Sequence, residues 1–133
     1  IDYEILVVND GSTDSTLDLL KKEAQKNKKI RIVSYEKNKN IGYALKIGFE
    51  RSKGEYIITI DSDLSYDAKY IIDLYNELEN SGYDIIQGSP YMKGGDALGV
   101  PRLRLLISKA SNMFFSYAIG TSVHTVTGVF RGY

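Results

Sequence analysis

Short apolar runs alternate with amphipathic segments along the whole chain. The apolar runs are rich in valine, isoleucine and tyrosine and are bounded by Gly, Asn, Asp and Ser, so each predicts a strand. The expected strands cover residues 3–9, 30–36, 55–61 and 83–89. The segments between them carry apolar residues at spacings of three and four, which predicts helices. The expected helices cover about 15–27, 43–53, 68–80 and 102–119, and Gly54 and Gly82 should end the second and third.

The alternation of strand and helix defines the expected fold class. Four strand–helix pairs repeat at roughly 25 to 30 residues, which is typical of βαβ units with right-handed crossovers. We therefore expect an α/β protein with a mainly parallel sheet flanked by helices. The last helix should bury one apolar face, made of Leu103, Leu106, Ile107, Ala110, Phe114 and Tyr117.

Polar residues follow each of the four expected strands. In an open parallel sheet, ligands bind outside the carboxyl ends of the strands. The sets are Asn9, Asp10, Gly11 and Ser12; Asn38, Lys39, Asn40 and Gly42; Asp61, Ser62, Asp63 and Ser65; and Gln87, Gly88 and Ser89. If all the strands are parallel, the four sets fall on one edge of the sheet, which predicts a binding site there.

The "DSD" triplet after the third strand has two interpretations. Asp61 and Asp63 project to the same side of an extended chain, about 7 Å apart, and a small turn would let them share a cation. Oxygen ligands favour Mg²⁺ or Mn²⁺ over zinc. Alternatively Asp63, Ser65 or Asp67 only caps the following helix. The same choice applies to Asp10, which could cap a helix or accept hydrogen bonds from a nucleobase.

The last helix carries a polar stripe opposite its apolar residues. Arg104, Ser108 and Asn112 recur every fourth residue and span about 12 Å of one face. Such a stripe can be solvent-exposed, but an arginine on it is also suited to phosphate recognition. His124 is the only histidine, and no triad surrounds it, so we expect a structural role.

The composition excludes several classes of protein. The 133 residues include 17 basic and 17 acidic side chains, so no basic excess points to a nucleic-acid partner. There is no cysteine, which excludes a disulfide framework or thiolate metal site. No apolar run approaches the roughly 20 residues needed to cross a bilayer. The length suits a single domain, and the absence of a cap before the first strand suggests to us a piece of a longer chain.

Five blocks of sequence together resemble the family-two inverting glycosyltransferases. They are "YEILVVNDGSTDST", "NKNIGYALKIGFERSKGEYIITIDSDLSYD", "QGSPYMKGG", "GVPRLRLLISKASN" and "TVTGVFRGY", in the order that the family has them. The chain is most similar to polyprenyl-phosphate sugar transferases of the dolichol-phosphate mannosyltransferase type. This resemblance implies the A-type nucleotide-sugar fold, which is a Rossmann-like parallel sheet with a short antiparallel extension. It also implies that residues 1–133 form a single catalytic domain. We expect this domain to lack the family's first strand and C-terminal elements.

The resemblance also assigns roles to residues. Asp10 matches the contact to the nucleotide base, Asp61 and Asp63 match the Asp-x-Asp element, and Asp63 matches the metal ligand. The expected catalytic residues are Asp61, Asp63, Arg104 and Arg131, the arginines meeting phosphate. The expected donor-binding residues are Asn9, Asp10, Ser12, Asn40, Gly42, Asp61, Ser108 and Asn112. The implied cofactor is Mg²⁺ or Mn²⁺, and the implied donor is a GDP- or UDP-sugar.

The resemblance further implies a lipid-phosphate acceptor and a peripheral position at the cytoplasmic face of a membrane. A phosphate monoester is largely ionised at neutral pH, with a second pKa of about 6, so the lack of an obvious general base fits such an acceptor. Three positions depart from the family pattern: Ser65 replaces a glutamine, Pro90 an arginine and Thr125 an acidic residue. Two alternatives stay open, a haloacid-dehalogenase-like phosphatase that uses "DSD" and a non-catalytic nucleotide-sugar-binding domain.

Overall fold

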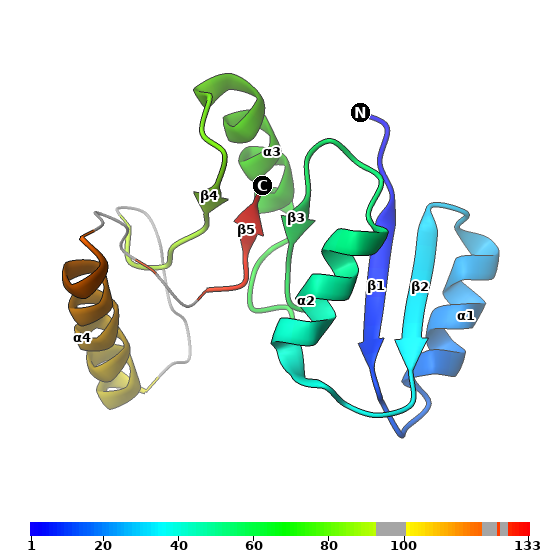
Figure 1. Cartoon of the computed structure of the whole chain (residues 1–133). Helices are drawn as coiled ribbons and strands as arrows, with labels where there is room; N and C mark the ends of the chain where they lie inside the picture. Colours follow the sequence, from blue (N-terminus) through cyan, green and yellow to red (C-terminus); the bar gives the residue numbers. More distant parts are fainter. Residues whose placement is uncertain (93–100, 121–124, 126–127) are drawn as a thin grey trace. The chain divides into compact units, whose positions relative to one another are not determined.

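The structure is a computed structural model that describes residues 1–92, 101–120, 125 and 128–133. These residues form two compact units, Ile1–Ile57 and Ile58–Tyr133, which are treated separately below. Helices α1 and α2 and strands β1 and β2 belong to the first unit, and the remaining elements belong to the second (Figure 1).

The first unit is a parallel βαβ unit with one further helix. Strand β1 (Ile5–Asp10) pairs in parallel with β2 (Ile30–Tyr35), in register from Ile5 opposite Ile30 to Asp10 opposite Tyr35. Helix α1 (Thr16–Lys26) connects the two strands and packs on β2, while α2 (Asn40–Arg51) packs on β1. The parallel pairing confirms the expected α/β class for this half of the chain.

The second unit is built around a short central strand that the sequence pattern did not predict. Strand β5 (Arg131–Gly132) lies between β3 (Ile58–Thr59) and β4 (Ile86–Gln87) and is antiparallel to both. Helix α3 (Lys69–Ser81) contacts all three strands, and the second helix of the unit is α4 (Arg102–Ile119). Strands β3 and β4 are therefore parallel to each other through β5.

The core of the second unit is small and centres on α3 and β5. Among the described residues of the chain, the buried apolar side chains are Leu74, Leu78 and Phe130. Gly132 of β5 lies directly under α3, since a Cβ at this position would come within 2.5 Å of the Leu78 Cδ1 atom. The lack of a side chain on Gly132 thus lets the helix approach the central strand closely.

The ends of the helices match the predictions except for α2, which begins at Asn40, three residues before the expected start at 43, and also ends differently. Gly82 ends α3 and Gly120 ends α4 in the left-handed conformation, with φ of 71° and 70°. Helix α2, in contrast, ends at Arg51 with an extended cap at Ser52, so the prediction that Gly54 ends it is wrong. The expected strands at 55–61 and 83–89 shrink to two residues each, because only those residues pair with β5.

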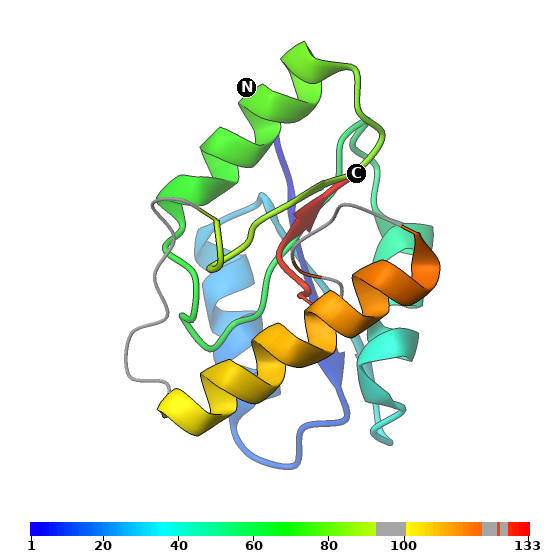
Figure 2. The same cartoon turned by 90° about the vertical axis from the view of Figure 1, so that its left-hand side faces the viewer.

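The predicted inward face of α4 is also wrong. Leu103, Leu106, Ile107, Phe114 and Tyr117 are each more than half exposed, and Ala110 is exposed as well. The covered side of the helix is instead a narrow stripe that includes Ser108 and the buried Asn112. In Figures 1 and 2, α4 stands apart from α3, which agrees with this limited coverage. Within the described part of the chain, no helix is both long and apolar enough to span a membrane.

Candidate functional site

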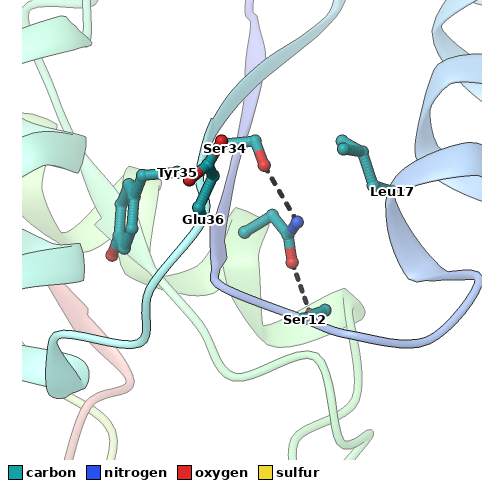
Figure 3. Close-up of a pocket in the computed structure, with 6 residues that line it drawn as sticks. Ser12, Leu17, Ser34, Tyr35 and Glu36 are labelled. Carbon is teal, nitrogen blue, oxygen red and sulfur yellow. Dashed lines mark hydrogen bonds between the residues drawn. The ribbon is translucent and has the colours of Figure 1, made fainter.

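The carboxyl ends of β1 and β2 are joined through the side chain of Asn9. This residue is 5% exposed, and its amide donates to the Ser34 hydroxyl at 3.0 Å while its oxygen accepts from the Ser12 hydroxyl. Figure 3 draws these two bonds as dashed lines that end at Ser34 and Ser12. Because a buried amide is costly to leave unpaired, these bonds fix the position of the first turn relative to both strands.

The loops that follow β1 and β2 are packed against each other. The Asp10 carboxylate accepts the Lys39 backbone N–H at 2.7 Å. Gly11 has φ of 69°, and a Cβ there would come within 2.4 Å of the Asn38 backbone nitrogen, so only glycine fits. Asn40 also has a positive φ of 73°, and its side-chain oxygen accepts the Gly42 N–H at 3.1 Å at the start of α2.

A pocket of about 470 Å³ opens beside this strand edge. It is lined by Asn9, Ser12, Leu17, Ser34, Tyr35 and Glu36. Two expected donor-binding residues, Asn9 and Ser12, therefore share one cavity with an apolar wall and several hydroxyl groups. Tyr35 is directed away from Leu17, towards the opposite side of the strand (Figure 3).

An aromatic and charged cluster lies on that opposite side. The rings of Tyr35 and Tyr43 meet edge to face at 5.3 Å, and the Lys39 Nζ atom lies 4.4 Å from the centre of the Tyr43 ring. Among the described residues, the buried Tyr35 phenol oxygen has no hydrogen-bond partner. Burial, together with the nearby Asp10 carboxylate, raises the pKa of Tyr35 to about 12. Sequence reasoning missed this cluster, although Tyr35 and Tyr43 stand on either side of the polar residues 38–42 in the sequence.

In the second unit, the two aspartates of "DSD" have different environments. Burial raises the pKa of Asp61, and the negative charge of Asp63 raises it further. Asp63 is exposed, and the backbone N–H and hydroxyl of Ser65 lower its pKa; the N–H lies 2.9 Å from one carboxylate oxygen. Leu64, which lies between Asp63 and Ser65, has φ of 62°, so the turn after β3 is tight. The two carboxylates are separated by one residue in the chain, and the charge of Asp63 acts on Asp61.

The capping role expected for Asp67 is consistent with the contacts of this residue. Its carboxylate accepts the Lys69 backbone N–H at 2.9 Å, at the first turn of α3, and lies 3.1 Å from the Lys69 ammonium group. Asp63 makes a similar bond to the Ser65 N–H, and its carboxylate has further lone pairs with which it could bind a cation. The contact of Asp67 agrees with the capping interpretation, and the metal interpretation stays a prediction.

Tyr66 connects the aspartate turn to the strand that carries Arg131. Its ring stacks on Phe130 with centroids 4.6 Å apart and an interplanar angle of 27°. Burial raises the pKa of Tyr66, and the charge of Asp61 adds to this effect. Phe130 precedes Arg131, whose partners across the sheet are Thr59 and Gln87. Tyr66 was not predicted as a site residue, because a tyrosine in a turn carries no distinctive sequence signal.

The polar stripe of α4 is attached to the loop after β4. The Tyr91 phenol donates to the Ser108 hydroxyl at 2.6 Å, and the Asn112 amide donates to the Ser108 carbonyl at 2.9 Å. Arg104 is exposed at the start of the same stripe. A second hydroxyl pair, Ser89 and Thr125, lies at 2.6 Å near the end of β4. Hydrogen bonds between hydroxyl groups thus link Tyr91 to α4, and Ser89 to Thr125, within the second unit.

The aspartate turn fits a hard divalent cation in its chemistry. Asp61 and Asp63 can supply two carboxylate ligands, a number that Mg²⁺ typically takes from a protein, with water and phosphate oxygens completing the shell. A cation would also offset the mutual repulsion that raises the pKa of Asp61. In the described part of the chain, no group of three or more acidic or histidine side chains forms a metal site.

The expected site residues are divided between the two units. Asn9, Asp10, Ser12, Asn40 and Gly42 lie at the strand ends of the first unit, and Asp61, Asp63, Arg104, Ser108, Asn112 and Arg131 lie in the second. The expectation that all four strand ends share one sheet edge stays a prediction, as do the catalytic and binding roles. His124 lies outside the described residues.

Comparison with known proteins gives a consistent result. The family model described as glycosyl transferase family 2 matches residues 1–133. A dolichol-phosphate mannosyltransferase from Pyrococcus furiosus is 34% identical over 113 residues, which covers 85% of this chain and 32% of that protein. An uncharacterized glycosyltransferase, sll0501, from Synechocystis is 36% identical over 96 residues, covering 72% of this chain and 30% of that protein. The chain thus spans about a third of the length of these relatives.

Proposed function

The chain belongs to glycosyl transferase family 2, and from this membership and the geometry above we propose that it transfers a sugar from a nucleotide-sugar donor to a polyprenyl phosphate. The donor would be a GDP- or UDP-sugar, and the acceptor a dolichyl or undecaprenyl phosphate. The reaction would invert the anomeric centre and use a divalent metal. The observation that carries the proposal is the match of this family over the whole chain, together with the two carboxylates, Asp61 and Asp63, in the turn after β3.

The first unit would bind the nucleoside part of the donor. The pocket beside β1 and β2 offers an apolar wall at Leu17 and hydrogen-bonding groups on Asn9 and Ser12. The bonds of Asn9 to Ser12 and Ser34 hold these groups in place before the donor arrives, which lowers the entropy lost on binding. Asp10 is engaged with the Lys39 N–H, and its second oxygen could accept a bond from a base.

The second unit would act on the diphosphate and the sugar. Asp61 and Asp63 would hold Mg²⁺ or Mn²⁺, which when bound supplies positive charge for the diphosphate leaving group. Arg104 and Arg131 would add guanidinium donors, whose planar fork matches phosphate oxygens. Tyr66 would hold the aspartate turn against β5 through its stack on Phe130.

The acceptor step would need no strong base from the chain. A phosphate monoester with a second pKa of about 6 is mostly the dianion at neutral pH, so its oxygen can attack the anomeric carbon directly. The bond from this carbon to the donor diphosphate breaks as the new bond to the acceptor oxygen forms. The lipid nature of such an acceptor supports a position at a membrane surface, and the cytoplasmic face is part of the proposal. The name of the Pyrococcus relative supports a lipid-phosphate acceptor for this branch of the family.

The proposal is tested by a transfer assay with two acceptors. Purified protein is incubated with a labelled GDP- or UDP-sugar, Mn²⁺ and either a polyprenyl phosphate or the corresponding polyprenol. We expect labelled lipid only with the phosphate, because a neutral alcohol would need a general base and the proposal assigns this role to no residue. Product with the polyprenol at the same rate would contradict the proposed acceptor. Donor binding without transfer to any acceptor would favour a non-catalytic nucleotide-sugar-binding domain.

A further inference from the structure

Helix α4 is covered along a narrow and mostly polar stripe. The covered residues are Leu105, Ser108, Asn112 and Ser116, whereas most of the large apolar side chains of the helix are exposed. A helix of a globular protein is normally held in place by the burial of an apolar face. Because α4 buries little apolar area, hydrogen bonds contribute a larger share of the free energy that attaches it.

Tyr91, in the loop after β4, contacts two consecutive residues of this helix. Its phenol donates to the Ser108 hydroxyl at 2.6 Å, and the Lys109 ammonium group lies 5.6 Å from the centre of its ring. Consecutive residues of an α-helix point about 100° apart, so a rotation of α4 about its axis would break at least one of the two contacts. The Tyr91 side chain is therefore placed to fix the rotation of α4.

The backbone of Tyr91 is tied to the end of the short sheet. Its N–H donates to the Ser89 hydroxyl at 3.3 Å. The neighbouring Gly88 N–H donates to the Phe130 carbonyl at 3.0 Å, so this segment extends the pairing of β4 with β5. Arg131 follows Phe130 on β5. Tyr91 thus connects the strand that carries Arg131 to α4.

Arg104 shares its side of α4 with Ser108. It precedes Ser108 by four residues, which places it about one turn along the helix and only about 40° round the axis. The rotation that is set at Ser108 consequently determines where the exposed Arg104 side chain starts from.

We propose that Tyr91 is a positioning residue whose hydroxyl group docks α4 in the rotation that places Arg104, together with Arg131, for the donor diphosphate. The roles of the two arginines in this inference rest on the proposed function. The docking of α4 by Tyr91 rests on the contacts alone.

The first test measures how firmly α4 is held in the free protein. The chain has no cysteine, so Glu77→Cys on α3 and Met113→Cys on α4, both at exposed positions, accept spin labels at two defined points. Double electron–electron resonance then gives the distribution of distances between the labels. We expect a narrow distribution with Tyr91 present and a broader one in Tyr91→Phe, which loses the hydroxyl group but keeps the ring beside Lys109.

Further variants show whether the bond between Tyr91 and Ser108 is responsible. Ser108→Ala should broaden the distribution as Tyr91→Phe does, and the double variant should broaden it no further, because all three lack the same hydrogen bond. Tyr117→Phe removes a hydroxyl group from a tyrosine of α4 that is 88% exposed and should leave the distribution unchanged. A broad distribution with Tyr91 present, a narrow one in Tyr91→Phe, or additive effects of the two substitutions overturns the inference.

Nucleotide titration of the unlabelled variants tests the consequence for Arg104. In the presence of Mn²⁺, Tyr91→Phe should bind GDP or UDP about two- to tenfold more weakly, the factor that one hydrogen bond allows. Its affinity for GMP or UMP should stay the same, because Arg104 is assigned to the diphosphate. An unchanged affinity for the diphosphates, or an equal loss for both kinds of nucleotide, overturns the positioning of Arg104. Wild-type protein that binds none of these nucleotides but shows the expected distance changes refutes the proposed function and retains the docking role of Tyr91.

Discussion

Replacement of Phe130 by alanine should destabilise the protein more than any comparable change on the surface. Phe130 is 2% exposed and is one of the few fully covered apolar side chains in the described residues. Its ring stacks on Tyr66 at 4.6 Å and lies against the Gly88 backbone, where an added Cβ would come within 2.3 Å of the ring. The side chain therefore joins the aspartate turn, β4 and β5.

The expected loss follows from these contacts. Truncation of a buried phenylalanine to alanine costs about 3–5 kcal/mol, which includes the cavity that remains. The lost stacking with Tyr66 contributes about 0.5–1.5 kcal/mol of this amount. Because whole domains are stable by only about 5–15 kcal/mol, Phe130→Ala should bring the protein close to unfolding at room temperature. Phe130→Leu keeps most of the volume and should cost less than about 2 kcal/mol.

Urea unfolding followed by circular dichroism at 222 nm measures these changes. The control is Phe115→Ala, the same substitution on α4, where the side chain is 43% exposed. It should cost about 1–2 kcal/mol, because only a little over half of the side chain is covered. If Phe130→Ala and Phe115→Ala lower the free energy of unfolding by amounts within about 1 kcal/mol of each other, then Phe130 is not the centre of this unit.

Two further predictions concern the first loop and the pH dependence of stability. Gly11→Ala should lower the free energy of unfolding by about 1–2 kcal/mol more than Gly82→Ala does. Both glycines have positive φ, but only at Gly11 would an added Cβ press on the Asn38 backbone. Equal losses of free energy in urea unfolding would exclude a steric origin. The hydrogen bond from the Arg31 guanidinium lowers the pKa of Glu4 in the folded protein. The carboxylate therefore stabilises the fold above its ordinary pKa of 4.5. This stabilisation is lost as the pH falls through the lower pKa of the folded state. Glu4→Gln should thus cost about 1 kcal/mol at pH 7 and progressively less below pH 4.5; a constant difference between pH 7 and pH 3 would contradict the assignment.

Local signals were sufficient to predict the helices and the parallel strand pair. The bounds of α4 match the prediction, because Pro101 and Gly120 mark its two ends in the sequence. The pairing of β1 with β2 follows from apolar runs separated by a helix, which is a pattern of short range.

The remaining features depend on contacts between distant residues. Strand β5 is only two residues long and exists because β3 and β4 approach it from segments about 70 and 45 residues away in the chain, which no local pattern records. The periodicity of α4 showed that one face is apolar but not what that face contacts, so burial was predicted where the structure has exposure. Periodicity specifies a face, and only tertiary packing determines its surroundings.

The candidate site shows the same division. The polar strand ends pointed to Asn9, Asp10 and the "DSD" aspartates, because such residues after buried runs stand out in a sequence. Tyr66 and Tyr35 did not stand out, since their importance comes from a stack on Phe130 and from a buried phenol near Asp10. Aromatic residues of this kind become recognisable only when their neighbours in space are known.

The central claim is that the turn after β3 binds a nucleotide-sugar diphosphate through a divalent metal. Isothermal titration of the protein with GDP- and UDP-sugars, with and without Mn²⁺, tests it most directly. We expect binding of one donor that requires Mn²⁺, is lost in Asp63→Ala and is retained in Asp67→Asn, since Asp67 is engaged in capping α3. Donor binding of wild-type strength in Asp63→Ala, or binding that is the same without Mn²⁺, would contradict the claim.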